Sequence, residues 1–491
     1  MGAPTAVHGT QSRRPTAPVS APSPSPWPWV VLGACGAWGM VLTGTRIAAV
    51  PDPHLARWWF SLPAGGAPFE SVGFYVSLAL TLVAWFGLGR VAYAGRLTPG
   101  RAWVILAVWA LPFLLGPPLF SRDLYSYVAQ GLLAHHGANP YTVTPSTLGP
   151  GPLLSGVASV WRHTTSPYGP LFVGASRGVS ALAGGSLAVQ VVAYRLLELV
   201  GVVLVMVSLP PLARHLGSDP GIALWLGALS PLALFSFVAS GHNDALMAGL
   251  LVAGVTLGVT GRLLPGLILC ALAATVKLPA AAGVVFLAAD AMDGESGARR
   301  WRVVGLAAAT LVVVVVGVTE LAGYGWTWLG PTALHIPTEL RILSTPSVSL
   351  GVLLFSVLHP LGIPVARSAV VTVSQDLVAA VAVAAVVWLL VTVRRHEVVR
   401  SLGLALILIV VGSPTVWPWY LMWGVVLLAA TTAQRSKVLT AVAGLAMLVV
   451  GPSGHPLLLG DWYLVVSLAC VVGLVWLVRG GHWRAVVGHA A

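Results

Sequence analysis

Asp123 is the acidic residue whose place in the sequence best suits acid–base chemistry. The 491 residues include only 14 Asp and Glu, so each carboxylate can be considered singly. Asp123 lies in the segment 121–127, which follows an apolar run and continues to His136 as a predicted amphipathic helix at the membrane surface, with the acid in its first turn. A carboxylate there could accept the proton of a hydroxyl group during a transfer reaction. The alternative is that Ser121 and Asp123 only stabilise the helix N-terminus.

Two motifs after this predicted helix carry side chains of the kinds that bind sugars. Asn139, Pro140 and Tyr141 end the helix, and a second motif, 164–170, contains Tyr168. Sugar sites use aromatic faces for apolar contact and amide or hydroxyl groups for oriented hydrogen bonds. Both motifs are also typical of ordinary turns, which is the simpler interpretation of each motif alone.

A compact polar cluster lies between two apolar runs and consists of Gly241, His242, Asn243 and Asp244. It could cap the helix that we predict to begin near Ala245. In the functional interpretation, His242 or Asp244 orients an acceptor hydroxyl or binds a cation. The local sequence leaves both roles open.

Lys277 is a cation inside an apolar stretch, 263–289. A charge within a membrane segment is costly, so such a residue is expected to have a function. A lipid phosphate is its natural partner, and Arg341, in the loop 323–347, could be a second phosphate ligand because guanidinium matches phosphate geometry. The alternatives are that Lys277 extends to the interface and that Arg341 is a solvated loop charge.

The aromatic run Trp417, Pro418, Trp419 and Tyr420 is typical of side chains that anchor a protein at the membrane–water interface. The sequence holds no Walker loop, no dinucleotide fingerprint and no metal-ligand motif such as HExxH. These absences argue against nucleotide-driven pumping and against a nucleotide-sugar fold. No cofactor is indicated, and a requirement for a divalent cation stays open.

Apolar helices must position all of these side chains. Hydrophobic residues make up 57% of the chain and charged residues 8%, against about 25% charged in ordinary globular proteins. Apolar runs of about 20 residues, the length that crosses a bilayer, recur between residues 27 and 478. They do not alternate with period two, which excludes a membrane barrel. We therefore predict an all-α polytopic membrane protein with about 13–14 spans.

The basic residues predict how these spans are oriented. The segment 1–26 is rich in Pro, Ser and Ala and is predicted to be a disordered cytoplasmic tail. The transmembrane domain covers 27–480, and 481–491 form a second cytoplasmic tail. On this topology 17 of the 26 Lys and Arg residues face the cytoplasm, as the charge rule for short loops expects. Residues 121–185, which contain the candidate base, and 322–347 then become loops on the outer face of the cell membrane.

The chain resembles the polyprenol-phosphomannose-dependent alpha-1,6-mannosyltransferases of the MptB type, within the GT-C membrane glycosyltransferases. The resemblance covers most of residues 27–480. Each motif that carries it is weak alone, whereas the ordered set is fairly specific. The motifs are Arg122-Asp123 with Tyr125, Ser126 and Tyr127, then Asn139-Pro140-Tyr141, Ser166-Pro167-Tyr168-Gly169-Pro170, His242-Asn243-Asp244 and Lys277-Leu278-Pro279.

This resemblance implies a GT-C-type helical bundle, a polyprenyl phosphate donor carrying mannose, and an active site on the outer face. It implies that the catalytic carboxylate is Asp123, which we expect to act as the general base of an inverting displacement. We expect Lys277 and Arg341 to bind the lipid phosphate. The expected acceptor is a mannan or lipomannan, and no nucleic-acid partner is expected. The predicted substrate-binding residues are Arg122, Tyr125, Tyr127, Asn139, Tyr141, Tyr168, His242, Asn243 and Asp244.

A transporter or flippase for lipid-linked sugars is the competing function, because it also needs many spans and an occasional buried charge. Such proteins usually have paired repeats and binding groups near the bilayer midplane. This sequence has no convincing repeat, and its polar residues cluster toward one face. Both features favour the enzyme.

Overall fold

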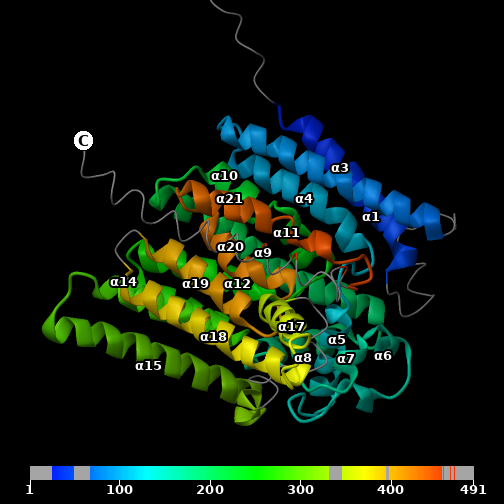
Figure 1. Cartoon of the computed structure of the whole chain (residues 1–491). Coiled ribbons are helices and arrows are strands. Elements are labelled where there is room, and N and C mark those ends of the chain that lie inside the picture. The colour runs from blue at the N-terminus through cyan, green and yellow to red at the C-terminus, as the bar shows by residue number, and fades with distance from the viewer. Residues whose placement is uncertain are drawn as a thin grey trace, which may run out of the picture.

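The computed structural model describes residues 25–48, 67–330, 345–393 and 397–455, together with residues 457, 465 and 469. Every regular element in this part of the chain is a helix (Figure 1), so the predicted all-α fold is confirmed there. Arg341, the predicted last span and the two predicted tails lie wholly or almost wholly outside the described residues.

Five of the described helices are long and apolar enough to cross a membrane. A bent pair, Pro220–Gly227 and Pro231–Ala239, would make a sixth span, with an angle of 47° between its halves. Several further apolar helices have 10–17 residues. The chain is therefore a multi-pass membrane protein, while the number of about 13–14 crossings stays a prediction. The five long helices are α1 (Trp27–Ile47), α3 (Ala67–Tyr93), α9 (Leu187–His215), α15 (Gly297–Ala322) and α18 (Arg367–Val391).

The shorter helices form three groups along the chain. The first group is α4 (Pro99–Leu115), α5 (Asp123–His135), η1 (Pro145–Leu148), α6 (Pro152–Gly156), α7 (Ser159–Arg162) and α8 (Pro170–Ala183). The second is α10 (Pro220–Gly227), α11 (Pro231–Ala233), η2 (Leu234–Ala239), α12 (Asp244–Val259), α13 (Leu263–Ala274), η3 (Leu278–Ala281) and α14 (Ala282–Met292). The third is η4 (Gly325–Leu329), α17 (Pro346–Leu358), α19 (Val398–Gly412), η6 (Pro418–Leu421), α20 (Met422–Leu428), α21 (Gln434–Ala443) and η7 (Ala446–Val449).

Polar caps followed by proline explain where several of these helices begin. Thr98, Asp219 and Ser230 each accept a hydrogen bond from a backbone N–H in the first turn of α4, α10 and α11, respectively. A proline follows each of them, at a position where a missing N–H leaves no helical hydrogen bond unmade. These three starts are therefore determined locally, even within a very apolar sequence.

The apolar residues 221–238 form a bent, broken element rather than one continuous helix. Helix α10 ends at Gly227. Helical structure resumes at Pro231 as the short helix α11 and continues as the π-helix η2. Pro231 has no N–H to donate to the preceding turn, which favours a break or kink in the helix at this point. By contrast, the predicted helix at 245–260 is confirmed as α12. The apolar stretch 263–289 is interrupted near Lys277 and forms α13, η3 and α14.

The predicted helix after Ser121 forms as α5, but it does not lie at the surface. Most of its residues are buried, and it packs against α6, α8 and α9. The polar side chains of Ser126 and Gln130 face the protein interior. The expected exposure of the polar residues was wrong because neighbouring helices of the bundle cover them, and Ser126 and Gln130 have no side-chain hydrogen-bond partner among the described residues. Helix α5 is thus part of the core that positions Asp123.

Small residues let α9 and α12 approach closely. A Cβ atom on Gly201 would collide with the backbone of Ala245, and one on Gly249 would collide with the backbone of Gly201. Close backbone contact of this kind is how helices commonly associate inside membranes. It holds the N-terminal end of α12, where the polar cluster begins, against α9.

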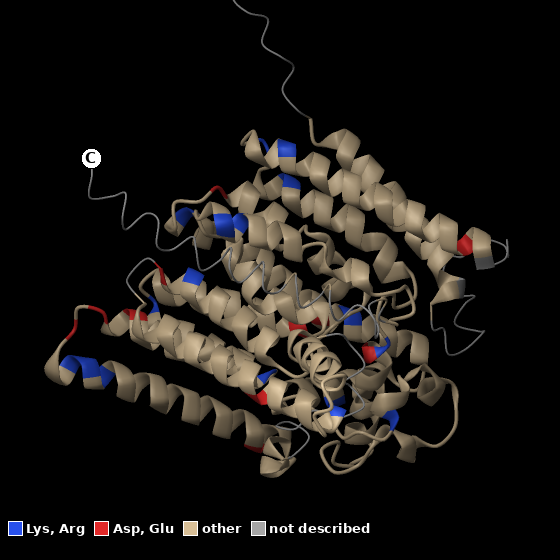
Figure 2. Ribbon diagram, in the orientation of Figure 1, with Lys and Arg blue, Asp and Glu red and all other residues tan. Residues whose placement is uncertain are grey.

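The two ends of the bundle differ in charge. Helices α5 to α8 lie at one end, and the connection between α14 and α15 lies at the opposite end (Figure 1). Many Lys and Arg residues gather at the α14–α15 end (Figure 2). Basic residues also occupy the last turn of α3, at Arg90, and the last turn of α9, at Arg214.

Candidate functional site

Asp123 is the first residue of α5, where the helix dipole favours a negative charge. Its backbone N–H donates to Ser121 Oγ at 3.1 Å, and Trp161 Nε1 donates to Asp123 Oδ1 at 3.2 Å. His242 Nε2 lies 3.7 Å from Asp123 Oδ2. The Asp123 side chain keeps 14% of its surface exposed, so a hydroxyl group can reach it. A capping role alone does not account for the two side chains from other elements that face this carboxylate.

Burial raises the pKa of Asp123 to about 6. The charge of Lys277 lowers this pKa, the charge of Asp244 raises it, and the hydrogen bond from Trp161 lowers it again. A group with a pKa near 6 is mostly ionised at pH 7, and it holds a captured proton more readily than an exposed carboxylate does. That balance suits a general base.

Asp244 is fully buried at the start of α12 and is the counter-ion of Lys277. Lys277 Nζ lies 2.8 Å from both carboxylate oxygens of Asp244. Trp423 Nε1 donates to Asp244 Oδ1 at 2.6 Å. A buried charge needs such partners because an unpaired one is strongly destabilising.

Aromatic rings enclose the cation of Lys277. Its Nζ lies 4.7 Å from the ring centre of Tyr420 and 5.7 Å from the ring centres of Tyr168 and Trp423. Ring faces attract cations, most strongly where water is excluded, and the Lys277 side chain is only 11% exposed. Lys277 therefore points to Asp244 and does not extend to the interface.

A backbone contact brings Tyr168 beside Lys277. The Gly169 N–H donates to Val276 O at 2.9 Å. A Cβ atom on Gly169 would collide with the carbonyl group of Thr275, so only glycine permits this approach. The motif at 166–170 is thus a turn, and the same turn builds one wall of the site.

Asn243 precedes α12 without capping it through its side chain. Glu198 of α9 supplies a cap instead, because its Oε2 accepts the N–H of Leu246 at 3.4 Å. Tyr127 O–H donates to Asn243 Oδ1 at 3.4 Å. In the described part of the chain, the buried Asn243 Nδ2 has no hydrogen-bond partner. The Asn243 Nδ2 group is therefore available to donate a hydrogen bond to a ligand.

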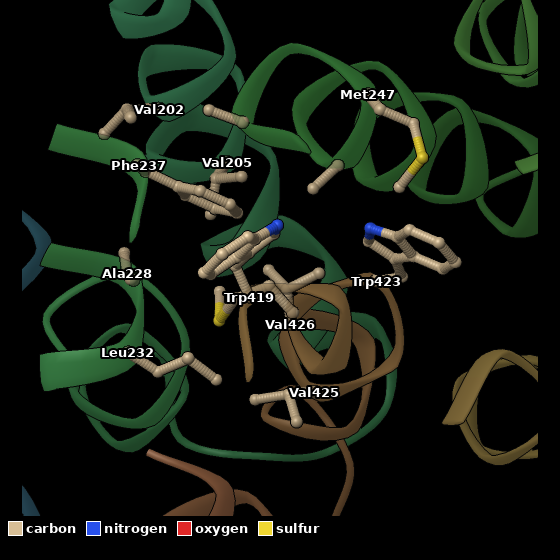
Figure 3. Packing of buried hydrophobic residues seen from close by; sticks show 14 of the residues in the cluster. Val202, Val205, Ala228, Leu232, Phe237, Met247, Trp419, Trp423, Val425 and Val426 are labelled. Atoms are coloured by element: carbon tan, nitrogen blue, oxygen red, sulfur yellow. The ribbon is translucent and has the colours of Figure 1, made fainter. Parts of the chain in front are cut away.

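His242 stacks on Trp419, with ring centres 4.0 Å apart and planes 22° from parallel. Trp419 is only 3% exposed, and it packs among apolar side chains of α9 and η2 (Figure 3). Trp417 stacks on Trp419 at 4.7 Å. The interpretation of Trp419 as an interfacial anchor was wrong, because η6 turns inward and places this ring against the polar cluster.

Arg122 and Tyr125 flank Asp123 in the sequence but have other surroundings. Arg122 Nε donates to Gly156 O at 2.7 Å, and its Nη2 donates to Ser155 O. These bonds fasten α6 to the start of α5. Tyr125 is buried, and its hydroxyl has no partner among the described residues.

Asn139 and Tyr141 lie beyond the far end of α5 from Asp123. Asn139 Nδ2 donates to Thr327 Oγ1 at 3.3 Å, and the ring of Tyr141 packs edge-on against Tyr324. These contacts fasten the turn after α5 to η4. The structure therefore brings Tyr127, Tyr168, His242, Asn243, Asp244 and Lys277 together around Asp123, while Arg122, Asn139 and Tyr141 hold the surrounding elements.

Sequence reasoning missed several residues that build this site. Arg195 of α9 donates to Gly116 O at 2.5 Å and to Ala239 O at 3.1 Å. It thereby ties together the segments that lead to Asp123 and to His242. A charge inside an apolar span was the available signal for Arg195 and for Glu198. Trp161 and Trp423 gave no signal, because a tryptophan in an apolar sequence is usually packing.

The arrangement combines a proton acceptor, a neutralised buried cation and free hydrogen-bond donors. In the described ranges, no group of three or more His, Cys, Asp or Glu side chains is placed to hold a metal ion. Such a site can take a proton from a hydroxyl group and stabilise negative charge that develops nearby.

Residues 30–293 match the family described as alpha-(1->6)-mannopyranosyltransferase, N-terminal domain, and residues 347–480 match the MptB C-terminal domain. The chain belongs to this mannosyltransferase family. The resemblance stated from the sequence motifs is therefore confirmed.

Relatives of this mannosyltransferase family align over most of the chain. Alpha-(1->6)-mannopyranosyltransferase A of Mycobacterium tuberculosis is 32% identical over 425 residues, which cover 83% of this chain and 80% of the relative. A probable alpha-(1->6)-mannopyranosyltransferase of Mycolicibacterium smegmatis is 32% identical over 506 residues, with 92% and 88% coverage. Alpha-(1->6)-mannopyranosyltransferase B of Corynebacterium glutamicum is 30% identical over 346 residues, with 66% and 57% coverage. No solved structure matches the chain.

Proposed function

We propose that this protein transfers mannose from a polyprenyl phosphate carrier to a hydroxyl group of a mannan or lipomannan acceptor, forming an alpha-1,6 linkage. Membership of the mannosyltransferase family supports the sugar and the linkage. The observation that carries the mechanism is the Asp123 carboxylate with its raised pKa, facing Trp161 and His242 beside the Asp244–Lys277 pair.

In the proposed reaction, Asp123 takes the proton of the acceptor hydroxyl while the acceptor oxygen attacks the anomeric carbon of mannose. The new bond joins that oxygen to the anomeric carbon, and the bond from this carbon to the phosphate oxygen breaks. The polyprenyl phosphate leaves with the electron pair. A single displacement inverts the anomeric centre, so a beta-linked donor yields an alpha product and one base suffices.

Lys277 is proposed to stabilise the departing phosphate, because its charge acts on Asp123 and its side chain is only 11% exposed. The phosphate would share this cation with Asp244. Arg341 remains the proposed second phosphate ligand. The proposed substrate contacts are Tyr127, Tyr168 and Asn243, which lie close to Asp123, together with the sequence-predicted Arg122, Tyr125, Asn139, Tyr141 and Asp244. His242, also predicted from the sequence as a substrate contact, faces the Asp123 carboxylate instead.

The outer face of the plasma membrane is the proposed location of the site, with both chain termini in the cytoplasm. The charge difference between the two ends of the bundle supports this orientation, because short cytoplasmic loops concentrate Lys and Arg. Many basic residues gather at the end opposite to α5 and α7 (Figure 2).

Cysteine labelling in intact cells tests this orientation. Ser159, at the start of α7, and Ser296, before α15, are both exposed. In a background whose three native cysteines are replaced, a membrane-impermeant maleimide should label Ser159→Cys and leave Ser296→Cys unlabelled until the membrane is permeabilised. The reverse pattern would place the site in the cytoplasm and refute the proposed location.

Purified protein incubated with radiolabelled mannosyl polyprenyl phosphate and a mannan oligosaccharide tests the reaction. The expected product is an oligosaccharide one mannose longer that an alpha-1,6-mannosidase shortens again. Movement of the labelled lipid across vesicles without any new glycosidic bond would instead identify a transporter.

The rate of transfer is expected to fall as the pH is lowered through about 6, because a protonated Asp123 cannot accept the acceptor proton. Burial places this loss at a higher pH than for an exposed Asp, since it raises the pKa of the carboxyl group to about 6. The logarithm of kcat/KM should therefore rise with pH below 6 and level off above it. A profile that stays flat down to pH 4.5 would show that Asp123 is not the titrating base.

A further inference from the structure

His242 is fully buried, yet neither ring nitrogen has a hydrogen-bond partner among the described residues. Buried polar atoms are normally paired, so this exception requires an explanation. Nε2 faces Asp123 Oδ2 across 3.7 Å, which is longer than a hydrogen bond. Catalytic hydrogen bonds are often long in a ligand-free enzyme and shorten when substrate binds.

The backbone and the neighbouring ring hold His242 in one orientation. The backbone N–H of His242 donates to Ser236 O at 3.1 Å. The preceding residue, Gly241, has a φ of 70°, a conformation that favours glycine. Trp419 covers one face of the imidazole at 4.0 Å. Because these contacts restrict rotation of the ring, its Nε2 edge stays directed toward Asp123.

The ring is neutral near pH 7. Burial lowers the pKa of His242 to about 3, while the charge of Asp244 raises it and the charge of Lys277 lowers it. A neutral imidazole donates a hydrogen bond from one nitrogen and accepts at the other. With the proton on Nε2, the ring is a donor aimed at the carboxylate.

We propose that His242 is a positioning residue for Asp123: its neutral ring donates from Nε2 to Asp123 Oδ2 and, together with Trp161 on Oδ1, holds the carboxylate in the orientation that accepts the acceptor proton. This inference rests on the proposed function of Asp123 as the general base. Stacking against Trp419 keeps the His242 ring in this orientation.

Several other groups also face Asp123 and are unchanged by substitutions at His242. Lys277 lowers the pKa of the carboxyl group, and Asp244 raises it. The hydroxyl groups of Tyr127, Tyr168 and Tyr420 are close enough for Asp123 to affect their ionisation. A shift of the pH profile in a His242 variant can therefore be attributed to the loss of the imidazole donor.

The test compares His242→Met with His242→Gln in the mannosyl transfer assay. Met fills the space without a donor, whereas the Gln amide can donate from nearly the place of Nε2. For His242→Met we expect kcat to fall about 10²-fold with little change in KM, since a misplaced catalytic group costs about that much. The acid limb of the pH profile should also move up by about one unit, because a hydrogen bond to the ionised carboxylate is lost. Most of both effects should be recovered in His242→Gln.

The matched control is His136→Gln, which changes an exposed histidine just after α5 and should match the wild type. Trp419→Leu gives a second measurement if His242→Met does not fold, and should raise the acid limb in the same direction. An unmoved acid limb with a raised KM would assign His242 to direct substrate binding and overturn the proposal. Gln behaving no better than Met would also overturn it. Absence of any transfer by the folded wild type would refute the proposed function itself, which separates the two failures.

Discussion

Replacing Asp123 with Asn should lower kcat for mannosyl transfer by about 10²–10⁴-fold, the usual contribution of a general base. The amide cannot accept the acceptor proton. Its carbonyl oxygen can still accept the hydrogen bond that Trp161 donates at 3.2 Å. Binding of the donor lipid should be nearly unchanged, so the loss should lie in kcat and not in KM.

The folded state of this variant should be no less stable than that of the wild type. Burial raises the pKa of Asp123, so the charged form is disfavoured in the folded protein, and a neutral amide removes that cost. Thermal unfolding in detergent measures this directly. The matched control is Asp219→Asn, because Asp219 caps α10 by accepting the Ile222 N–H at 2.9 Å and Asn caps helices equally well. A kcat of Asp123→Asn within a few-fold of the wild type would refute the role of this carboxylate.

Replacing Lys277 with Met should have the largest effect on stability among the substitutions considered, about 3–5 kcal/mol. Asp244 would keep a fully buried charge, and among the described residues only Trp423 would still donate a hydrogen bond to its side chain. The double variant Lys277→Met with Asp244→Asn should recover most of this loss, because no uncompensated charge then remains. Lys437, the only other lysine in the chain, provides the control, and Lys437→Met should unfold like the wild type.

The double variant also separates folding from catalysis at Lys277. If Lys277 stabilises the departing phosphate, the double variant should fold and yet transfer mannose at least about 10²-fold more slowly. Full activity in the stable double variant would mean that Lys277 serves only to neutralise Asp244. A single variant as stable as the wild type would instead show that the ion pair does not hold α12 to the α13–η3 break.

Local sequence predicted the features that depend on neighbouring residues. The start of α12 and the break at Lys277 between α13 and η3 follow from apolar runs interrupted by polar residues and proline. Lys277 could be singled out because a charge in an apolar stretch is costly wherever the chain folds. The predicted surface position of α5 failed because polarity along one helix does not show which other helices will cover it.

The composition and the ordered motifs determined by themselves that this is a multi-pass helical membrane protein with a mannosyltransferase resemblance, and they singled out Asp123 and Lys277. Only the tertiary structure decided what each of these side chains faces. Trp161 and Asp123 are 38 residues apart, Lys277 and Asp244 are 33 apart, and Trp423 and Asp244 are 179 apart. The physical reason is that apolar burial is non-directional and can be read from composition, whereas pairing two polar groups depends on where distant helices cross.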